Sequence, residues 1–180
     1  MQMLSFEQAF HQLIQQAHPT QKTETVPLAK AVGRVLAQPV QSQMDVPAQD
    51  NSQMDGYALH SYDLSHDQHF EVSQRITAGQ AATQPLATGT VARIFTGAPI
   101  PPQANAVVMQ ENVEMIDDNT VRVKQTKVAA GEHIRRQGED IAQGATILEA
   151  GHRLRAQDLG LIASIGQAEV CVYVPLKIAT

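Results

Sequence analysis

The middle of this sequence is a series of short apolar or alternating runs, each of which ends at a turn. Between Val40 and about Ala145 these runs are rich in β-branched residues, and glycines or the triplet Asp117–Asn119 separate them. Such runs are typical of β-strands, and their close spacing favours a small barrel or sandwich over βαβ units. We therefore expect strands at residues 70–72, 91–95, 106–109 and 121–123, with a hairpin turn at the Asp117–Asn119 triplet.

Two patterns near the start of the chain predict helices. Ser5 can cap a helix that runs to Ala17, because Gln8 stands at the reciprocal position of a capping box. A second, shorter helix is expected over Pro27–Leu36, although Gly33 weakens it. The apolar face of the first helix consists of Phe6, Phe10, Leu13, Ile14 and Ala17.

The C-terminal part of the sequence mixes both kinds of structure. We expect a strand over Gly144–Leu148, a helix over Gln157–Ser164 with Gly166 just beyond its C-cap, and a strand over Ala168–Val174. Leu176–Thr180 resembles the start of another strand, which indicates a piece of a longer protein; a C-terminal edge strand is the alternative. The residues expected to be buried in the helix are Leu159, Ile162 and Ala163.

Composition narrows the class of protein. The 180 residues are 43% hydrophobic and 17% charged, which favours a globular fold over disorder. A net charge of −5 gives no basic footprint for nucleic acid or for an anionic membrane, and no apolar run approaches the length of a membrane span. The single cysteine, Cys171, fits a reducing compartment. We therefore expect a cytoplasmic protein that binds neither nucleic acid nor a membrane.

The stretch Asp50–Ala58 is the polar loop with the most functional groups in the fewest residues. It holds two carboxylates, an amide and a hydroxyl before Gly56, where the chain can turn and begin a strand. Asp55 and its neighbours can form a binding site, or they can be an Asx-turn loop in which Asp50, Asn51 and Asp55 bind only local backbone N–H groups.

Two further turns add candidate ligands. Thr96–Pro101 follows an expected strand and offers a hydroxyl and backbone N–H groups that can bind an oxyanion, or it is a plain proline-stiffened loop. Glu111 stands at the end of another apolar strand, where it is either a placed functional group or a surface carboxylate.

A charged stretch supplies the remaining candidates. Arg135 and Arg136 can bind phosphate through guanidinium forks, and Glu139 and Asp140 can bind a hard cation. The alternative is an arginine–carboxylate network within the loop. The signatures of a P-loop, a GxGxxG loop, a GxSxG elbow and a CxxC pair do not occur in the sequence.

Taken in order, these stretches resemble the molybdopterin molybdenumtransferase family, which includes MoeA and the gephyrin E domain. Each motif is weak alone, but the ordered series covers nearly the whole chain. The matching stretches are residues 45–47, 50–52, 54–58, 94–101, 106–111, 134–141 and 159–166.

The resemblance implies the last step of molybdenum cofactor synthesis. Family members cleave adenylylated molybdopterin with a divalent cation such as Mg²⁺, insert molybdate and release AMP. They are cytoplasmic homodimers, and other cofactor-biosynthesis proteins are possible partners. Only the N-terminal region is matched, so the molybdopterin-binding and C-terminal domains are missing, and we expect the 180 residues alone to be inactive.

The resemblance also assigns residues and domains. Asp55, Thr96 and Asp140 match catalytic positions that face the active-site cleft of the family, which forms between two subunits, with Asp55 and Asp140 as ligands of the metal. The fold implied is α+β and β-rich: an elongated dimerisation domain of residues 1–44 and 145–180 encloses a small barrel-like domain of residues 45–144. The residues assigned to binding phosphate and cofactor are Thr96, Gly97, Arg135 and Glu111.

Two other functions remain open from the sequence. The chain can be a non-catalytic dimerisation or scaffold module with the same fold. It can also be a stand-alone metal-dependent phosphoanhydride hydrolase that uses Asp55, Asp140 and Arg135.

Overall fold

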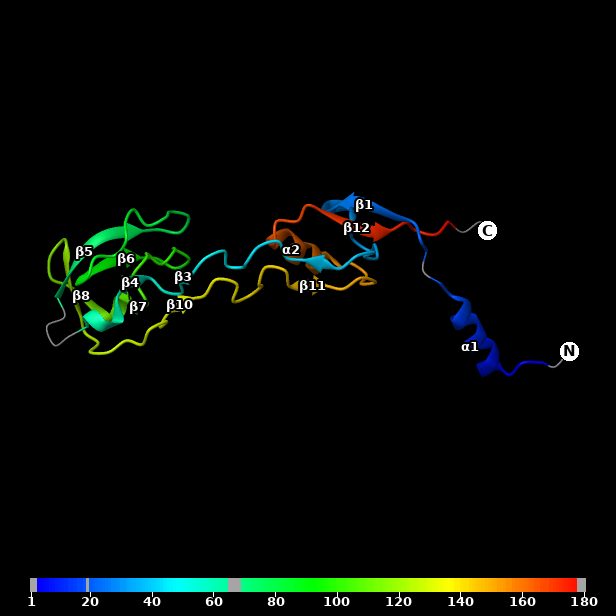
Figure 1. The fold of residues 1–180 in the computed structure, drawn as a ribbon, viewed down its shortest axis with the longest axis horizontal. Coiled ribbons are helices and arrows are strands. Elements are labelled where there is room, and N and C mark those ends of the chain that lie inside the picture. Colours follow the sequence, from blue (N-terminus) through cyan, green and yellow to red (C-terminus); the bar gives the residue numbers. More distant parts are fainter. Residues whose placement is uncertain (1–2, 19, 65–68, 178–180) are drawn as a thin grey trace. The chain divides into compact units, whose positions relative to one another are not determined.

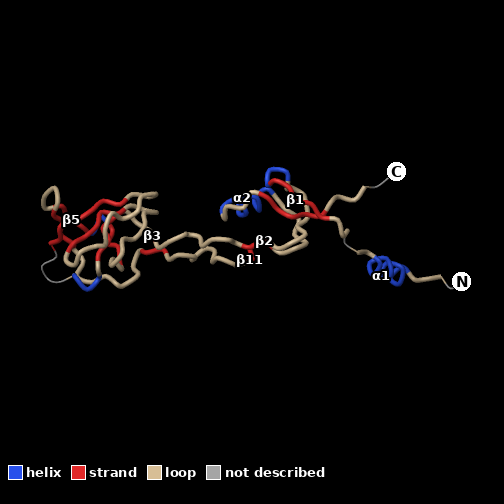
Figure 2. Tube along the Cα trace, turned by 45° about the horizontal axis from the view of Figure 1, so that its top comes forward, coloured by secondary structure: helices blue, strands red, loops and turns tan. Residues whose placement is uncertain are grey.

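The computed structural model describes residues 3–18, 20–64 and 69–177, which fall into two compact units. Unit 1 consists of Met1–Gln41 and Thr146–Thr180, and unit 2 of Ser42–Ala145. Within these described ranges, no helix is long and apolar enough to cross a membrane. Figure 2 shows that strands and loops make up most of the chain and that helices are few, which confirms the β-rich class.

Unit 2 is built on a mixed six-stranded sheet that curls into a half-barrel (Figure 1). Neighbouring strands are antiparallel except β5 and β6, which are parallel. All four strands expected between residues 70 and 123 are present, and the Asp117–Asn119 turn joins β8 to β9 as predicted. In spatial order the strands are β7 (Ala106–Met109), β4 (Gly56–Leu59), β6 (Thr90–Ile94), β5 (His69–Ile76), β9 (Thr120–Val123) and β8 (Val113–Met115).

Both faces of this sheet are covered, which explains why β4 and β7 are apolar along their whole length. Every residue of β4 is buried, and side chains alternate between two clusters on opposite faces. One cluster contains Tyr57, Leu59, Val91 and Val108, and the other contains Ala58, Ile76, Ile94 and Val107.

Short elements complete unit 2. β3 (Asn51–Ser52) pairs with β10 (Ile134–Arg135) in a separate two-stranded ladder. Two single-turn 3₁₀ helices follow strands of the main sheet, η2 (Ser61–Asp63) and η3 (Gln110–Asn112).

Unit 1 contains two small ladders and two helices. β1 (Thr23–Pro27) pairs antiparallel with β12 (Glu169–Tyr173), and β2 (Val40–Gln41) pairs with β11 (Thr146–Leu148). The helices are α1 (Phe6–Gln16) and α2 (Ala156–Ser164).

The cap predicted for the N-terminal helix is confirmed. Ser5 Oγ accepts a hydrogen bond from Gln8 N, and Gln8 Oε1 accepts one from Ser5 N, so the capping box is complete. No residue of α1 is buried, and its apolar face is exposed to solvent. The exposed apolar side chains of this face are Phe6, Phe10, Leu13 and Ile14.

The prediction of a helix over Pro27–Leu36 is wrong. Only a 3₁₀ turn, η1 (Leu28–Lys30), forms there, with Ala31 as its C-cap, and Gly33 further on takes a positive φ of 78° that a continuing helix does not allow. Beyond the turn the backbone pairs with a distant segment, because Gly33 N donates to Leu154 O and Leu36 N donates to His152 O. Long-range pairing therefore overrides the local helical pattern.

Helix α2 forms as expected, but it buries a different set of residues. Gly166 closes the helix with a positive φ of 78°, as predicted. Ile162 is buried, whereas Ala163 is exposed and Leu159 is half-buried. Asp158 is buried in their place. The strand expected at Leu176–Thr180 does not form at Leu176 and Lys177, and residues 178–180 lie outside the described part of the chain.

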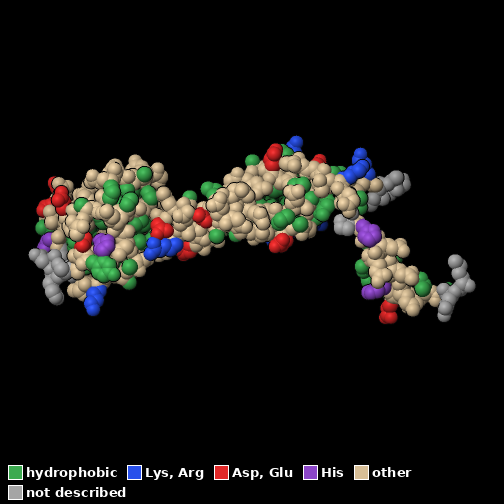
Figure 3. Space-filling view, viewed as in Figure 1, with side chains coloured by type: hydrophobic (Ala, Val, Ile, Leu, Met, Phe, Trp, Pro, Cys, Tyr) green, Lys and Arg blue, Asp and Glu red, His purple; other side chains and the backbone are tan. Residues whose placement is uncertain are grey.

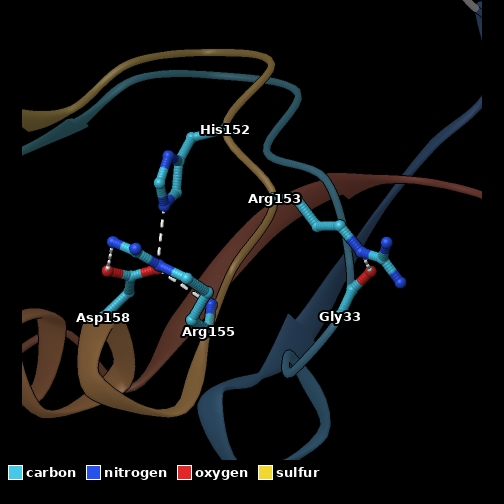
Figure 4. Close-up of polar contacts among 5 residues, drawn as sticks. All are labelled: Gly33, His152, Arg153, Arg155 and Asp158. Carbon is cyan, nitrogen blue, oxygen red and sulfur yellow. Dashed lines mark hydrogen bonds and ion pairs between the residues drawn. The ribbon is translucent and has the colours of Figure 1, made fainter.

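Asp158 is buried because three groups bind its carboxylate (Figure 4). Arg155 Nε and N donate to Oδ2 over 3.1 and 2.8 Å, and His152 Nε2 donates to the same oxygen over 2.8 Å. Nearby, Arg153 Nε donates to Gly33 O over 3.3 Å. The hydrogen bonds of Arg155, then of His152, hold the pKa of Asp158 far below its usual range. This network fixes the start of α2.

One glycine in unit 2 has no room for a side chain. A Cβ on Gly56 would lie 2.0 Å from Val108 O in the neighbouring strand. We predict that Gly56→Ala lowers the free energy of unfolding of unit 2 by about 3 kcal/mol, because β4 must shift away from β7. Urea unfolding followed by circular dichroism measures this change.

The matched control is Gly160→Ala in α2. Gly160 is in a helix and has open space around its would-be Cβ, so alanine there should stabilise the protein by about 0.5 to 1 kcal/mol. Equal effects of the two substitutions would contradict the close approach of β4 and β7.

Candidate functional site

Three polar loops meet at one end of the main sheet. Because β4 is antiparallel to β6 and to β7, its first residue lies opposite the last residues of both neighbours. Gly56 pairs with Ile94 on one side and with Met109 on the other. The residue before β4, Asp55, therefore lies beside the loops that follow β6 and β7, which begin at Phe95 and Gln110.

Asp55 and Thr96 contact each other directly. Asp55 Oδ1 accepts two hydrogen bonds from Thr96, one from the backbone N and one from Oγ1, each 2.9 Å long. These bonds, the backbone one first, lower the pKa of Asp55 below its usual range. Both residues are exposed. The structure thus brings together two of the three residues assigned to catalysis, with a carboxylate kept ionised at the surface.

The loop around Asp55 is held from both sides. Ser52 Oγ donates to Met54 O over 2.6 Å, and Gln110 N donates to Asp55 O over 3.0 Å. Since the second bond joins Asp55 to the first residue of η3, it also places the neighbouring Glu111, which is exposed. Asp55, Thr96 and the η3 turn therefore form one fixed surface.

The Asx-turn interpretation of the Asp50–Ala58 loop is wrong for both of its aspartates. Asp55 binds Thr96, which is 41 residues away in sequence. Asp50 binds Gln137 N and Arg136 Nη1 over 2.8 and 2.6 Å, from 87 and 86 residues away. These carboxylates tie distant segments together instead of capping their own turn.

The backbone N–H groups around Gly97, which were expected to bind phosphate, already donate hydrogen bonds within the protein. Gly97 has the positive φ expected of a glycine turn, 80°, but its N–H donates to Ser52 O over 2.8 Å. Thr96 N is bound to Asp55, and Ala98 N donates to Phe95 O. Each N–H of this turn already has an acceptor, so a phosphate bound by Gly97 N–H would have to displace Ser52 O, and this assignment stays a prediction.

The charged stretch forms the intramolecular network given as the alternative to phosphate binding. Arg135 Nη2 pairs with Asp140 Oδ2, and Arg136 Nη1 pairs with Asp50 Oδ2 at 2.6 Å. Figure 3 shows that Lys and Arg side chains lie next to Asp and Glu side chains on the surface. Exposed pairs of this kind contribute about 0–1 kcal/mol each, so they position the loop more than they stabilise it.

The surroundings of the Asp50 carboxyl group shift its pKa in both directions. Desolvation, the largest single effect, raises its pKa, but the hydrogen bonds from Gln137 N and Arg136 together outweigh it. The net result is a pKa below the usual range for Asp50.

Backbone pairing joins the two halves of the candidate site. Arg135 lies opposite Asn51 in the β10–β3 ladder, and Asn51 forms a bridge with Pro99 in the loop that contains Thr96. Within the described residues no hydrogen bond or ion pair joins Asp140 to Asp55. A metal ion shared by Asp55 and Asp140 therefore stays a prediction.

A magnesium ion at this site stays a prediction, and the side chains present could supply only one or two carboxylates to it. Asp55 Oδ1 is occupied by Thr96, which leaves Oδ2 for a cation. In the described ranges no three His, Cys, Asp or Glu side chains gather as a metal site. Mg²⁺ commonly uses one or two carboxylates, several waters and the phosphates of a substrate, so one or two aspartates suffice.

Sequence reasoning missed Arg93, which organises this end of the sheet. Arg93 Nη1 donates to Gly56 O over 2.9 Å, and Nη2 donates to Gln110 Oε1 over 2.6 Å. Its guanidinium also lies over the rings of Tyr57 and Phe95. The signal in the sequence was an arginine in the middle of an otherwise apolar strand.

Comparison with known proteins gives one consistent family. The family described as the MoeA N-terminal region (domain I and II) matches residues 4–166. The chain is 36% identical over 176 residues to the molybdopterin molybdenumtransferase of Haemophilus influenzae, covering 98% of this chain and 43% of that protein. It is 40% identical over 154 residues to molybdopterin molybdenumtransferase 2 of Mycobacterium tuberculosis, covering 82% and 37%. These matches confirm the resemblance seen in the polar motifs.

A solved structure shares the fold. The molybdopterin biosynthesis moeA protein from Pyrococcus horikoshii OT3 aligns with a TM-score of 0.87 at 33% identity, covering 96% of this chain and 46% of that one. The chain thus spans less than half the length of the relatives that it matches.

The Asp55–Thr96 contact leads to a prediction about the pKa of Asp55. Thr96→Val keeps the β-branched shape and the backbone bond but removes the hydroxyl donor, so the pKa of Asp55 should rise while staying below its unfolded value. Because the folded pKa is lowered, the contribution of Asp55 to stability is present above the unfolded pKa and is lost as pH falls through the folded one. Thr96→Val should therefore narrow the pH range, between the unfolded and the folded pKa of Asp55, over which this contribution to stability is lost.

Carboxyl NMR titration of both proteins measures the change. Asp117 is the internal control, since its pKa is also lowered by hydrogen bonds, first from Asn119 N, but it has no contact with Thr96. Equal shifts at Asp55 and Asp117 would contradict the assignment.

Proposed function

This chain belongs to the MoeA family, in which it corresponds to the N-terminal region, and we propose that it is the N-terminal part of a molybdopterin molybdenumtransferase. In this proposal the whole protein inserts molybdate into adenylylated molybdopterin and releases AMP during molybdenum cofactor biosynthesis. Relatives that carry this enzyme's name match the chain over most of its length. The proposed setting is the cytoplasm, alongside other proteins of the same biosynthesis.

The observation that carries the proposal is the Asp55–Thr96 pair at the meeting point of three loops. Its carboxylate is exposed, kept ionised and fixed in orientation by two hydrogen bonds. A fixed anionic oxygen at the surface suits a cation that accompanies a pyrophosphate. Glu111 is placed beside it through the Gln110–Asp55 bond.

Each residue has a separate role in this proposal. Asp55 Oδ2 binds the cation, and Thr96 acts through Asp55 by holding its other oxygen. The bound Mg²⁺ would neutralise phosphate charge and polarise the attacked phosphorus centre. Asp140 supplies the second carboxylate, and its ion pair holds the guanidinium of Arg135 in the same loop, where it can meet phosphate oxygens.

We also propose that the protein acts as a homodimer. The exposed apolar face of α1 supports this, because four large apolar side chains on one helix gain free energy when a second copy covers them. A non-catalytic scaffold would use the same surface, but it gives no reason for the fixed, ionised Asp55. The enzymatic proposal therefore accounts for more of the structure.

Loss of the Asp55 carboxylate should abolish most of the activity. In a full-length protein that contains this chain, we predict that Asp55→Asn lowers AMP release from adenylylated molybdopterin, with molybdate and Mg²⁺ present, by about 10²- to 10³-fold. Asp140→Asn should lower it as well. AMP is quantified by chromatography, and Asp117→Asn is the control, because it removes a surface carboxylate that is also bound by turn N–H groups. Full activity of Asp55→Asn would refute the proposed site.

The isolated 180 residues should release no AMP above background. Asp55 and Thr96 are exposed on an open surface, so the reacting phosphates need further protein groups to exclude water. Mg²⁺-dependent AMP release by these residues alone would instead favour the stand-alone hydrolase.

A further inference from the structure

A pocket lies on the sheet of unit 2; it shares Arg93 with the surroundings of Asp55, but its lining includes none of the residues assigned to catalysis or phosphate binding. Its volume is about 380 Å³. Strands β4, β5 and β6 form its floor, and the β8–β9 hairpin contributes Met115, Asp118 and Asn119 to its wall. Cavities of this size hold small organic ligands.

The two arginines of this floor lie against two aromatic rings, Tyr57 in the lining and Phe95 just after β6. Tyr57, Arg93 and Arg75 stand in register on three neighbouring strands, because Arg93 pairs with Tyr57 on one side and with Arg75 on the other. The guanidinium carbons of Arg75 and Arg93 each lie 4.5 Å from the centre of the Phe95 ring. Arg93 also lies 5.1 Å from the centre of the Tyr57 ring.

Neither arginine of this cluster forms an ion pair within the described residues, although the charge of Arg93 is near enough to Asp55 to help lower its pKa. Both hydrogen-bond acceptors of Arg93 are uncharged, Gly56 O and Gln110 Oε1. Arg75 is exposed, and in the described ranges its guanidinium has a ring contact but no ion pair. Asp118 is the one acidic residue in the lining. Two like charges that share one aromatic ring repel each other, and an anion placed between them relieves the repulsion.

The rest of the lining suits an aromatic ring that carries hydrogen-bond donors. Guanidinium planes stack on heterocyclic bases, and Met115, which is 64% exposed, offers a polarisable apolar contact. Asp118 can accept a hydrogen bond from an exocyclic amino group, and the amide of Asn119 can donate or accept. The pocket therefore combines an anion site with a site for an amino-substituted ring.

We propose that this pocket binds a purine nucleoside monophosphate. The phosphate binds at Arg75 and Arg93, and the base lies against the guanidinium of Arg75 and the β8–β9 hairpin. Because the pocket shares no proposed catalytic residue with the Asp55 site, this proposal does not rest on the proposed function. It assigns a ligand-binding role to a face of the sheet that the Asp55 chemistry does not use.

Calorimetric titration of the 180-residue protein with AMP tests the proposal. AMP should bind saturably with one site per chain, and Arg75→Gln should weaken binding about tenfold, which corresponds to one charge-assisted hydrogen bond. The control is Arg122→Gln. Arg122 is also exposed on this sheet and carries the same charge, but it is not part of the pocket lining, and it pairs with Glu114 at 3.7 Å. This control should bind AMP within twofold of the unchanged protein.

Adenosine and inorganic phosphate are titrated separately, and both should bind more weakly than AMP. NMR should show that AMP shifts the amide signals of Arg75 and Asn119. Three results would overturn the proposal: no saturable AMP binding, equal weakening by Arg75→Gln and Arg122→Gln, or phosphate that binds as tightly as AMP. Arg75 has no role in the proposed catalysis, so Arg75→Gln should weaken AMP binding to this pocket without lowering AMP release by a full-length protein, and failure of one proposal is distinguishable from failure of the other.

Discussion

The close packing of β4 between β6 and β7 is the constraint on which the candidate site depends. Gly56 lets β4 approach the carbonyl of Val108, where any side chain would collide. This register places Asp55 at the ends of two antiparallel neighbours. Asp55 can then accept both hydrogen bonds from Thr96 while its backbone carbonyl receives Gln110 N. A shift of one residue in β4 would turn its side chains to the other face and separate all three loops.

Arg93 connects this strand packing to the polar chemistry. It binds the carbonyl of Gly56 and the side chain of Gln110, so it fixes the same two loops that hold Asp55. Its guanidinium also lies against Phe95, the residue before Thr96, and Arg75 contacts the same ring. One side chain therefore supports the Asp55 site and lines the neighbouring pocket. This arrangement explains why an arginine stands between buried residues of β6.

Local patterns predicted the elements whose partners lie close in sequence. The capping box of Ser5 and Gln8, the turn at Asp117–Asn119 and the closing Gly166 all formed as expected, because each depends on groups a few residues apart. The helix expected over Pro27–Leu36 failed, since backbone bonds to residues 152–154 compete with it. The partner of Asp50 and the occupied N–H of Gly97 were equally out of reach, because their partners are far away in the chain.

The sequence by itself determined the family, the β-rich class and the identity of Asp55, Thr96 and Asp140 as candidates, because ordered motifs and strand periodicity are local properties. Only the tertiary structure decided that Asp55 and Thr96 share two hydrogen bonds, that Asp140 pairs with Arg135, and that the Gly97 N–H is already bound. The physical reason is that these contacts are set by strand register and by long-range backbone bonds. Neither strand register nor long-range bonding produces a periodic pattern in the sequence of the residues that take part.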